Sequence, residues 1–579
     1  MRVLSVLLSL YLTLSTPIAL AQSTQIGKGG AAATADRYAT ETAINILRTG
    51  GNAVDAAVAA AAMINVSNPF RAGIGGGGFM LIYLANEDRV VTFDAREMAP
   101  LAATPEMFID DAGDTMSSTE QGSSGLSVGV PGTLAGWNEA LKRYGTLELA
   151  AVLRPAIRLA EEGFAVNETF VSQIADQRER FAAFTSTSKL FLPDGAVPRV
   201  GSTFRNPDLA KTLRLIAEHG TNAFYKGKIA DDIVETVQNP PAVQDPSFEV
   251  RGQQMTLADL NSYNVVLRDP IVTKYHDFRI YGMGPPSSGG LTVGLILNIL
   301  EGSDLGALPR PEALHKMIEA MRLGFTDRDV YTGDSDFVNV PVSGLRSQDY
   351  ADERAELIDE ESKIDVTPGN PFTHQDDPSP PLLPPGDDSE GPSTTHIVTV
   401  DAAGNAASFT TTIGRTGGSG IVVPGRGFIL NSALNAFDEV PGGPNSVEPR
   451  KRSRSSMSPT IVTRNGELYL ALGSPGGSTI ITTVTQVLLN VLEFWMSLPE
   501  AIEAPRFSNR GGARTDIEIN VPPSEALLQV LEEHGQIFSR TEEIGAVTGV
   551  LIRDDGELLA AAEKVRRGGG SAQVVNPRE

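Results

Sequence analysis

The chain has 579 residues, of which 41% are hydrophobic and 20% charged, with no cysteine and a formal net charge of −24. This composition is that of an ordinary globular protein, and it excludes a disordered chain and a membrane protein with many spans. Without cysteine there is no disulfide, no thiolate nucleophile and no sulfur-bound metal. The acidic balance argues against a nucleic-acid partner, because a phosphate-binding surface needs clustered Lys and Arg, and the one dense basic cluster, 450–454, is short.

Residues 1–21 have the pattern of a secretory signal peptide. Arg2 precedes an apolar run from Val3 to Leu14, which Pro17 ends, and Ala19-Leu20-Ala21 is a small-x-small cleavage site. An uncleaved membrane anchor is the alternative, but the run is shorter than the roughly 20 apolar residues that a span requires. We therefore expect this segment to be removed. The mature protein is then periplasmic or secreted, with no membrane span.

Helices and strands alternate along the next part of the chain. The spacing of apolar residues predicts a helix over 38–47, and Asn52 can cap a second helix over 53–63. This second helix is apolar on all sides, which indicates a buried position between layers. Short strands are predicted at 79–83 and 90–93. Further helical patterns lie at 133–144, 150–162, 208–219, 229–237 and 313–325.

Residues 365–393 differ from the rest, because they are rich in Pro, Asp, Gly and Ser. Such a segment cannot pack a core, so we expect a flexible linker or an exposed loop. Strand patterns follow it at once. The abrupt change to a strand that opens with Thr394-Thr395-His396 is the main architectural signal of the sequence. The strands predicted after the linker are 395–400, 405–413, 459–463 and 468–472, and a helix is predicted over 482–496.

Two motifs match known functional patterns but stand in the wrong context. Gly73–Gly78 satisfies G-x-G-x-x-G, yet a helix precedes it and a strand follows, which is the reverse of a dinucleotide site. Close backbone packing beneath a site explains these glycines better. Ser127 lies in a G-x-S-x-G motif, but the residues before it are polar and do not form a buried strand. A Ser127 esterase is therefore a minor alternative.

The histidines do not indicate a metal centre. The chain has six, no two of them lie three or four residues apart on a helix, and no H-E-x-x-H motif occurs. The usual role of such isolated histidines is structural or at the surface. We expect no metal and no cofactor.

The pair Ser393-Thr394 offers a mechanism that needs neither histidine nor metal. If the bond after Ser393 is cut, Thr394 becomes a chain end whose hydroxyl lies beside a free α-amine. Such an amine has a pKa of about 7.7–8.0, which suits a general base at neutral pH. One residue then supplies both nucleophile and base. The same hydroxyl can first attack the Ser393 carbonyl and form an ester that water cleaves. From spacing alone, an ordinary threonine at a strand edge is the commoner interpretation.

Over nearly its whole mature length the sequence resembles the γ-glutamyltransferase family. The matching motifs occur in the family's order at 50–57, 73–80, 94–100, 130–133, 285–290, 327–328, 333–334, 394–396, 455–460 and 473–478. The resemblance implies an α+β fold, the four-layer αββα sandwich of N-terminal-nucleophile hydrolases. It also implies a precursor that cuts itself before Thr394 into a large chain, 22–393, and a small catalytic chain, 394–579, which form a heterodimer. Thr394 would move a γ-glutamyl group from a donor such as glutathione to water or to an amino acid.

The resemblance assigns catalytic roles to three further residues. Thr412 matches the family's second threonine, whose hydroxyl holds and tunes the Thr394 amine; a plain β-branched strand residue is the alternative. Gly476 and Gly477 match the oxyanion hole, where backbone N–H groups meet the developing negative charge. Loss of one such donor slows an enzyme about 100–1,000-fold.

The resemblance also assigns the residues that bind the donor's α-carboxylate. Arg96 matches the arginine of that site, a role that the planar guanidinium suits. The alternative for Arg96 is an ion pair with Glu97 or another carboxylate. Ser455 and Ser456 match the hydroxyls that share the same carboxylate, and plain loop serines are the alternative.

The sequence departs from the family where the donor's α-ammonium is bound. The family has Asn or Glu two residues beyond the second threonine, and this chain has Gly414. The family's N-N-[QE]-x-x-D stretch is 431–436 here, and Ala433 replaces Gln or Glu while Ala436 replaces Asp. An ammonium without a partner in a desolvated pocket is costly. Half of the γ-glutamyl recognition site is therefore missing from the sequence.

The donor remains open for this reason. The leading hypothesis is a γ-glutamyltransferase or glutathione hydrolase, in which Asn435 or Asp438 replaces the lost contacts. The first alternative is an amidohydrolase similar to cephalosporin and glutaryl acylases, which act on acyl chains without the α-amine. A catalytically silent protein that keeps only the scaffold is the second alternative. The short segment 438–451 predicts an open pocket.

Overall fold

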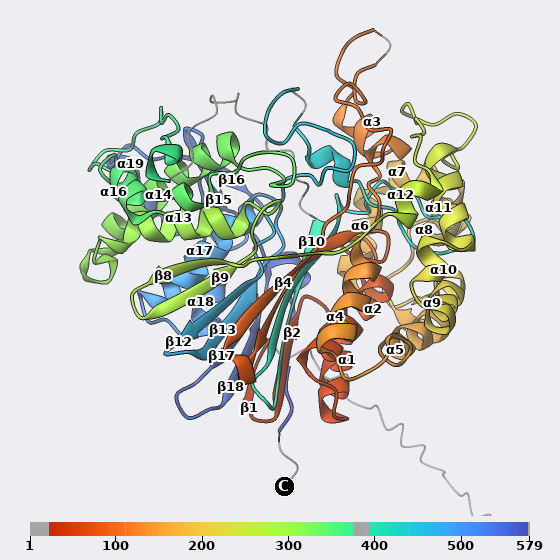
Figure 1. Ribbon diagram of the computed structural model, residues 1–579, viewed down its shortest axis with the longest axis horizontal. Coiled ribbons are helices and arrows are strands. Elements are labelled where there is room, and N and C mark those ends of the chain that lie inside the picture. Colours follow the sequence, from red (N-terminus) through yellow and green to blue (C-terminus); the bar gives the residue numbers. More distant parts are fainter. Residues whose placement is uncertain (1–22, 111, 376–390, 392, 439–440, 577–579) are drawn as a thin grey trace, which may run out of the picture.

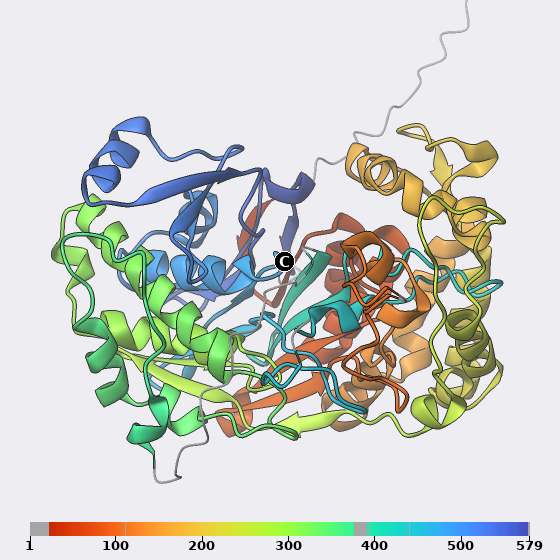
Figure 2. The same ribbon diagram turned by 90° about the horizontal axis from the view of Figure 1, so that it is seen from above.

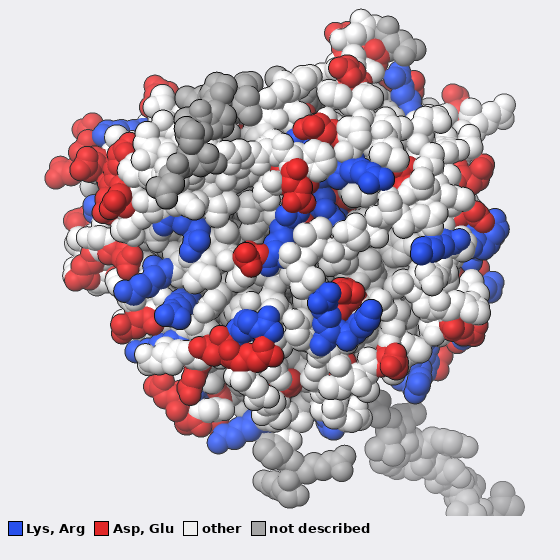
Figure 3. Space-filling model, in the orientation of Figure 1, with Lys and Arg blue, Asp and Glu red and all other residues white. Residues whose placement is uncertain are grey.

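The structure, a computed structural model, describes residues 23–110, 112–375, 391, 393–438 and 441–576. The predicted signal peptide and most of the predicted linker lie outside these residues. Within them, no helix combines the length and the apolar character needed to cross a bilayer. On the face shown in Figure 3, basic and acidic side chains are interspersed over the surface.

The first of two large sheets carries Thr394. It has seven strands, and its hydrogen-bonded pairs are antiparallel. The strand order mixes segments that are far apart in the chain, so the residues around Thr394 come from both halves of the sequence. The order is β19 (Ser571–Val574), β2 (Gly30–Thr34), β10 (Ser393–Asp401), β11 (Ala406–Gly414), β3 (Gly77–Leu84), β4 (Arg89–Ala95) and β7 (Val266–Arg268).

The second sheet also has seven strands joined in antiparallel pairs. It lies against the first sheet, and side chains from both contribute to one core, for example Phe79 and Val398 from the first and Ile461 and Leu470 from the second. The order is β1 (Thr24–Gly27), β18 (Leu558–Ala562), β17 (Thr548–Ile552), β13 (Glu467–Gly473), β12 (Thr460–Arg464), β9 (Phe278–Gly282) and β8 (Ile271–Tyr275).

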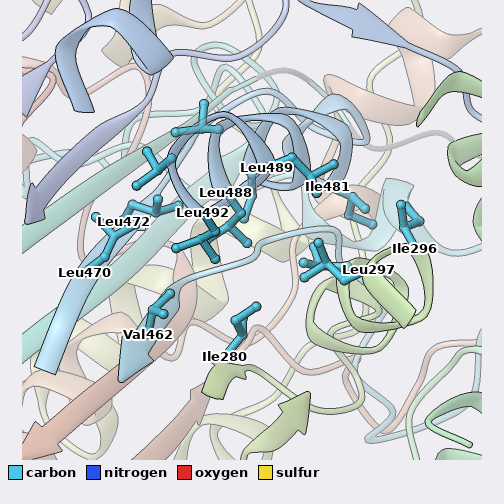
Figure 4. Close-up of a cluster of buried hydrophobic side chains, with 14 of the residues drawn as sticks. Ile280, Ile296, Leu297, Val462, Leu470, Leu472, Ile481, Leu488, Leu489 and Leu492 are labelled. Atoms are coloured by element: carbon cyan, nitrogen blue, oxygen red, sulfur yellow. The ribbon is translucent and has the colours of Figure 1, made fainter. Parts of the chain in front are cut away.

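Helices cover the two outer faces of this pair of sheets (Figures 1 and 2). The first sheet is covered by α1 (Arg37–Arg48), α2 (Ala53–Ser67) and α4 (Thr133–Tyr144), and the second by α13 (Gly289–Glu301) and α17 (Thr479–Leu492). Outside these helices, α5 (Leu149–Glu162) packs on α2, and α14 (Arg310–Tyr331) packs on α13. Figure 4 shows how apolar side chains of α17, among them Leu488 and Leu492, meet those of β12 and β13, among them Val462 and Leu470. This arrangement confirms the predicted αββα sandwich.

The remaining elements surround these four layers. Short strands form a pair, β5 (Phe164–Ala165) with β6 (Thr203–Phe204), and a small sheet of β14 (Phe507–Ser508), β15 (Arg514–Glu518) and β16 (Ile537–Thr541). The other helices are α3 (Ser118–Gly122), α6 (Glu168–Asp176), α7 (Arg178–Ala182), α8 (Thr185–Phe191), α9 (Pro207–His219), α10 (Asn222–Tyr225), α11 (Lys228–Gln238), α12 (Leu257–Asn261), α15 (Val342–Leu345), α16 (Gln348–Ala355), α18 (Leu498–Glu503) and α19 (Glu525–Glu533).

Local sequence signals explain the elements beside the site. Asn52 caps α2 through a reciprocal capping box with Asp55, and every residue of this Ala-rich helix is buried, as predicted. The N-terminus of α2 is tied to β10, because the Thr399 hydroxyl donates to the Ala53 carbonyl at 2.6 Å and Asp401 accepts from the Ala53 amide at 3.1 Å. The strand that begins near Thr394 is therefore anchored at its far end.

Two sequence predictions differ from the structure. The described part of the predicted linker is mostly exposed or half-buried, but it also docks at one point: Phe372 is buried, and Gly369 hydrogen-bonds to Asp327 and Tyr331 of α14. An apolar ring and glycine backbone groups thus dock on α14 despite the polar composition. The helix predicted over 482–496 begins and ends earlier, at Thr479 and Leu492, and Trp495 has a positive φ of 54°, which is incompatible with a continuing helix.

Candidate active site

Thr394 lies at the start of β10 and is almost fully buried, with 3% of its surface exposed. Its Oγ1 atom is 2.7 Å from the carbonyl oxygen of Ser393 and 3.3 Å from the hydroxyl of Thr412 on β11. The Thr412 hydroxyl donates to the same Ser393 carbonyl oxygen and accepts from the amide of Gly414 at 2.9 Å. Two hydroxyls therefore converge on the carbonyl of the bond that the sequence marks for cleavage.

The backbone around this pair departs from regular strand geometry. The β10–β11 register shifts between Ser393 and Thr395, so the Ser393–Thr394 bond lies at an irregularity of the sheet. Ser393 is held in place, because its hydroxyl donates to the Phe70 carbonyl at 2.8 Å. A shifted register turns residues away from the ladder, and such irregularities are common next to active sites.

The glycines of the 73–78 run pack directly beneath the site. A Cβ added to Gly76 would lie 2.0 Å from the carbonyl oxygen of Thr412, and one added to Gly75 would lie 2.1 Å from that of Ile429. These distances leave no room for any side chain, so only glycine permits the approach. The run thus has the packing role predicted from its sequence context.

One cavity brings together residues that are far apart in the chain. Thr394, Thr412, Arg96 and Gly477 all line it. The full lining among the described residues is Arg96, Gly391, Thr394, Thr412, Gly414, Arg415, Ser432, Ala433, Asn435, Ala436, Met457, Gly477 and Ile480.

Gly476 and Gly477 form the turn between β13 and α17 and have φ angles of 147° and 59°. Gly477 lines the cavity, and Gly476 precedes it in the turn. The first turn of α17 starts two residues later, at Thr479. The N-terminus of a helix presents unsatisfied N–H groups and a positive partial charge, which favours an anion at this point.

Arg96 is buried at the cavity and held by several groups. Its guanidinium donates to the Ser453 hydroxyl at 3.0 Å and to the Arg454 carbonyl at 3.4 Å. It also pairs with the Glu97 carboxylate at 3.4 Å. Arg96 therefore forms the ion pair of the alternative interpretation and also lines the cavity, while its binding of a donor carboxylate stays a prediction.

Ser455 and Ser456 are placed next to the cavity and make contacts elsewhere. The Ser455 hydroxyl accepts from the Met457 amide at 3.2 Å, and the Ser456 hydroxyl accepts from Arg328 of α14 at 2.7 Å. Of this segment, Met457 is the residue that lines the cavity. The structure thus brings the two serines near the site without directing them into it.

His396, two residues after Thr394 on β10, is a structural residue. Its ring is fully buried, with Nδ1 2.8 Å from the Thr410 hydroxyl, and Gly473 packs closely against it. Burial lowers the pKa of His396 to about 3, so the ring stays neutral.

The three positions that lost the family's polar groups, Gly414, Ala433 and Ala436, all line the cavity. Of the two residues considered as replacements, Asn435 lines the cavity, whereas the buried carboxylate of Asp438 hydrogen-bonds to Asn445 at 2.9 Å and pairs with Arg454 at 3.3 Å.

Gly414 cannot simply be replaced by the family's asparagine. Its φ is 91°, and an added Cβ would lie 2.5 Å from the Ser432 hydroxyl. The positive φ and the close Ser432 hydroxyl therefore together favour glycine at this position.

Arg415 also lines the cavity, although no sequence motif predicted it. It follows Gly414 directly, and its position one residue beyond the expected ammonium-binding group was the available signal. Its guanidinium donates to the carbonyl and, at 2.6 Å, to the hydroxyl of Ser118 on α3. The cavity therefore has two arginines.

The motif at Ser127 lies outside this cavity. Ser127 is fully buried in a short turn, 125–127, and its hydroxyl donates to the Ser124 carbonyl at 3.0 Å. No histidine among the described residues hydrogen-bonds to it. The described residues also hold no group of three or more His, Asp or Glu placed to bind a metal ion.

Comparison with known proteins agrees with this geometry. The family model described as gamma-glutamyltranspeptidase matches residues 39–574. The glutathione hydrolase proenzyme of Bacillus subtilis strain 168 is 39% identical over 551 residues, 94% of this chain and 91% of the relative. The acylase ACY 1 proenzyme of Pseudomonas sp. strain SE83 is 36% identical, over 93% of this chain and 92% of the relative.

Among solved structures, the chain is similar to the cephalosporin acylase from Bacillus halodurans, with a TM-score of 0.84 and 28% identity. The match covers 98% of this chain and 100% of the acylase chain. Sequence motifs, fold and relatives thus agree over nearly the whole chain. The chain belongs to the gamma-glutamyltranspeptidase family and is an enzyme of its γ-glutamyl hydrolase and transferase class.

Proposed function

We propose that the chain is a self-processing γ-glutamyl hydrolase and transferase that works through an ester on Thr394. The observation that carries this proposal is the convergence of the Thr394 and Thr412 hydroxyls on the Ser393 carbonyl oxygen. Glutathione is the expected donor, and water or an amino acid is the acceptor.

Processing begins when Thr394 Oγ1 attacks the carbonyl carbon of Ser393. The Thr412 hydroxyl, already donating to the carbonyl oxygen, stabilises the negative charge that develops there. The C–N bond then breaks, the nitrogen takes a proton and becomes the α-amine of Thr394, and Ser393 is left as an ester. Water hydrolyses the ester to a free Ser393 carboxylate and restores the hydroxyl.

Turnover of a donor repeats the same chemistry with the new amine as base. The amine takes the Thr394 hydroxyl proton while Oγ1 attacks the donor amide, and the proton passes to the departing amine. The backbone amides of Gly476 and Gly477, at the N-terminal side of α17, stabilise the oxyanion. Water or an acceptor amine then attacks the Thr394 ester and releases the acyl group.

Donor binding places a carboxylate on Arg96, which is buried and therefore little screened by solvent. We assign Ser455 and Ser456 to the same carboxylate. This assignment requires their hydroxyls to turn away from the Met457 amide and from Arg328, which they contact in the uncut chain.

Cleavage leaves two chains that cannot separate easily. In the first sheet, β10 and β11 of the small chain lie between β2 and β3 of the large chain, and in the second sheet β12 pairs with β9 across the same division. Separation would break several strand ladders, so we expect a stable heterodimer of 22–393 and 394–579. We also propose removal of 1–21 and export to the periplasm or beyond.

The deciding experiment is the intact mass of the purified protein, with Thr394→Ala beside the wild type. The wild type should give two masses that correspond to cleavage before Thr394, and the variant should give one uncut chain. The processed protein should release nitroaniline from γ-glutamyl-p-nitroanilide. A wild type that stays uncut and cleaves no amide would overturn the proposal and favour a silent scaffold.

A further inference from the structure

We infer that Arg415 determines donor specificity and that the cavity also takes acyl groups that end in a carboxylate and carry no ammonium, such as the monoamides of short dicarboxylic acids. Glutaryl amides are the simplest probe of this class. The inference rests on the proposed function, because it concerns the acyl group that Thr394 receives.

The charge of the cavity lining is the first observation. Among the described residues that line it, Arg96 and Arg415 carry positive charge, and there is no Asp or Glu. A carboxylate is attracted by both guanidinium groups, whereas an ammonium is repelled by them. Gly414, Ala433 and Ala436 add no side-chain oxygen, so the neutral side chains of Ser432 and Asn435 are the oxygen acceptors beside these positions in the described lining.

The uncut chain itself shows where an acyl chain runs. Residues just before the scissile bond are the acyl part of the protein's first substrate, and Gly391 lines the cavity with Thr394. Gly391 lies directly against Arg415, because a Cβ added to it would be 2.8 Å from Arg415 Cγ and 3.1 Å from its Cα. Departure of Gly391 after cleavage opens the space beside Arg415 to the acyl group of a donor.

Arg415 is built to keep its place and its charge. Its two terminal nitrogens donate to the backbone and hydroxyl oxygens of Ser118, and its own amide donates to Ser432 at 3.0 Å. Among the described residues no carboxylate forms an ion pair with it. Burial lowers the pKa of Arg415, but an arginine of this kind still carries its positive charge at neutral pH. The positive charge of Arg415 can therefore act on a ligand, because no neighbouring carboxylate among the described residues neutralises it.

The backbone at Gly414 prevents a polar side chain from restoring an ammonium-binding group at this position. The positive φ and the close Ser432 hydroxyl exclude a side chain there. The loss of the family's polar group at this position and the presence of Arg415 beside it are thus features of one turn. Together they leave a donor site that suits an anion at least as well as a zwitterion.

The test compares γ-glutamyl-p-nitroanilide with glutaryl-p-nitroanilide, which differ only in the α-ammonium. The readout is the ratio of kcat/KM for the glutaryl donor to that for the γ-glutamyl donor, measured on the processed wild type. We expect a ratio of one or more. We expect Arg415→Gln to lower that ratio by about tenfold, because the carboxylate of both donors loses the same attraction, whereas only the γ-glutamyl donor is relieved of a repulsion on its ammonium.

A role of Arg415 in structure alone would reduce kcat/KM for both donors equally and leave the ratio unchanged. Arg415→Met is the second variant, for the case that Arg415→Gln does not mature. It keeps the aliphatic stem against Gly391 and should also lower the ratio. Arg553→Gln is the matched control, since Arg553 is an exposed arginine paired with Glu557 outside the cavity, and its ratio should equal that of the wild type.

A wild-type ratio below one, or a ratio that neither Arg415 variant lowers, would overturn this inference while leaving γ-glutamyl chemistry intact. Cleavage of neither nitroanilide by the protein would instead overturn the proposed function, and this inference with it.

Discussion

The hydroxyl of Thr412 donates to the carbonyl oxygen of Ser393, although the two residues are 19 positions apart. This contact places a hydrogen-bond donor on the oxygen that becomes negatively charged if Thr394 attacks. A peptide carbonyl with such a donor and an adjacent nucleophile is prepared for cleavage, and two variants at Thr412 test whether the contact matters.

We expect Thr412→Val, which keeps the shape of the residue, to slow self-cleavage about 100-fold, as for the loss of one oxyanion donor. Thr412→Ser keeps the hydroxyl and should process at close to the wild-type rate. A time course of precursor and product bands on gels measures both rates. Equal rates for Thr412→Val and wild type would contradict a role for this hydroxyl.

Gly477→Ala should lower kcat for nitroanilide release about 100-fold or more. The residue has a φ of 59° and lines the cavity, so a side chain there should strain the turn and displace the N–H groups of the proposed oxyanion hole. The matched control is Gly556→Ala, which has a φ of 75° in a turn with no atom within 4 Å of an added Cβ. Its backbone strain is similar, but kcat should not change; a similar loss in both would point to general destabilisation.

Arg96→Lys should raise KM for γ-glutamyl-p-nitroanilide about 10- to 100-fold, because a lysine cannot replace the forked hydrogen bonds of the guanidinium. Self-cleavage should continue, since the precursor needs no free carboxylate on Arg96. Intact mass and steady-state kinetics on one preparation give both results. A normal KM would remove Arg96 from the donor site.

Stability should fall in acid partly through His396, whose pKa burial lowers to about 3 from an ordinary value near 6.5. Below about pH 6.5 the histidine binds a proton in the unfolded chain but stays neutral in the folded one. The free energy of unfolding is therefore unaffected by His396 above about pH 6.5 and falls by about 1.4 kcal/mol for each pH unit below it. Urea unfolding at pH 7 and pH 5, in uncut Thr394→Ala protein with and without His396→Asn, isolates the effect. The protein with His396 should lose about 2 kcal/mol more between these pH values; equal losses would contradict a neutral buried ring.

Much of the site's framework was predictable because it depends on neighbours in sequence. Asn52 caps α2 as predicted, and strand patterns marked β10 and β11. The packed role of Gly76 followed from the order of helix and strand around it. The family motifs pointed to Thr394, whose neighbourhood in the structure includes the second threonine.

Other features were missed because they depend on distant parts of the chain. The helix α13 and the strands β8 and β9 were not predicted, and the polar segment that precedes Thr394 docks on α14 through the contact of Phe372 with Tyr331. Asp438 was a candidate for the donor site, yet it is buried against Arg454, and no local pattern distinguishes such a carboxylate from a ligand-binding one.

The sequence by itself determined the family, the layered fold and the residue at which the chain is expected to cut itself, because motifs and periodic patterns are local and read along the chain. Only the tertiary structure decided which side chains share the cavity with Thr394. Electrostatic attraction and packing act through space, so the charge that a donor meets, with Arg415 present and Asp438 withdrawn, is set by contacts between segments that are remote in sequence.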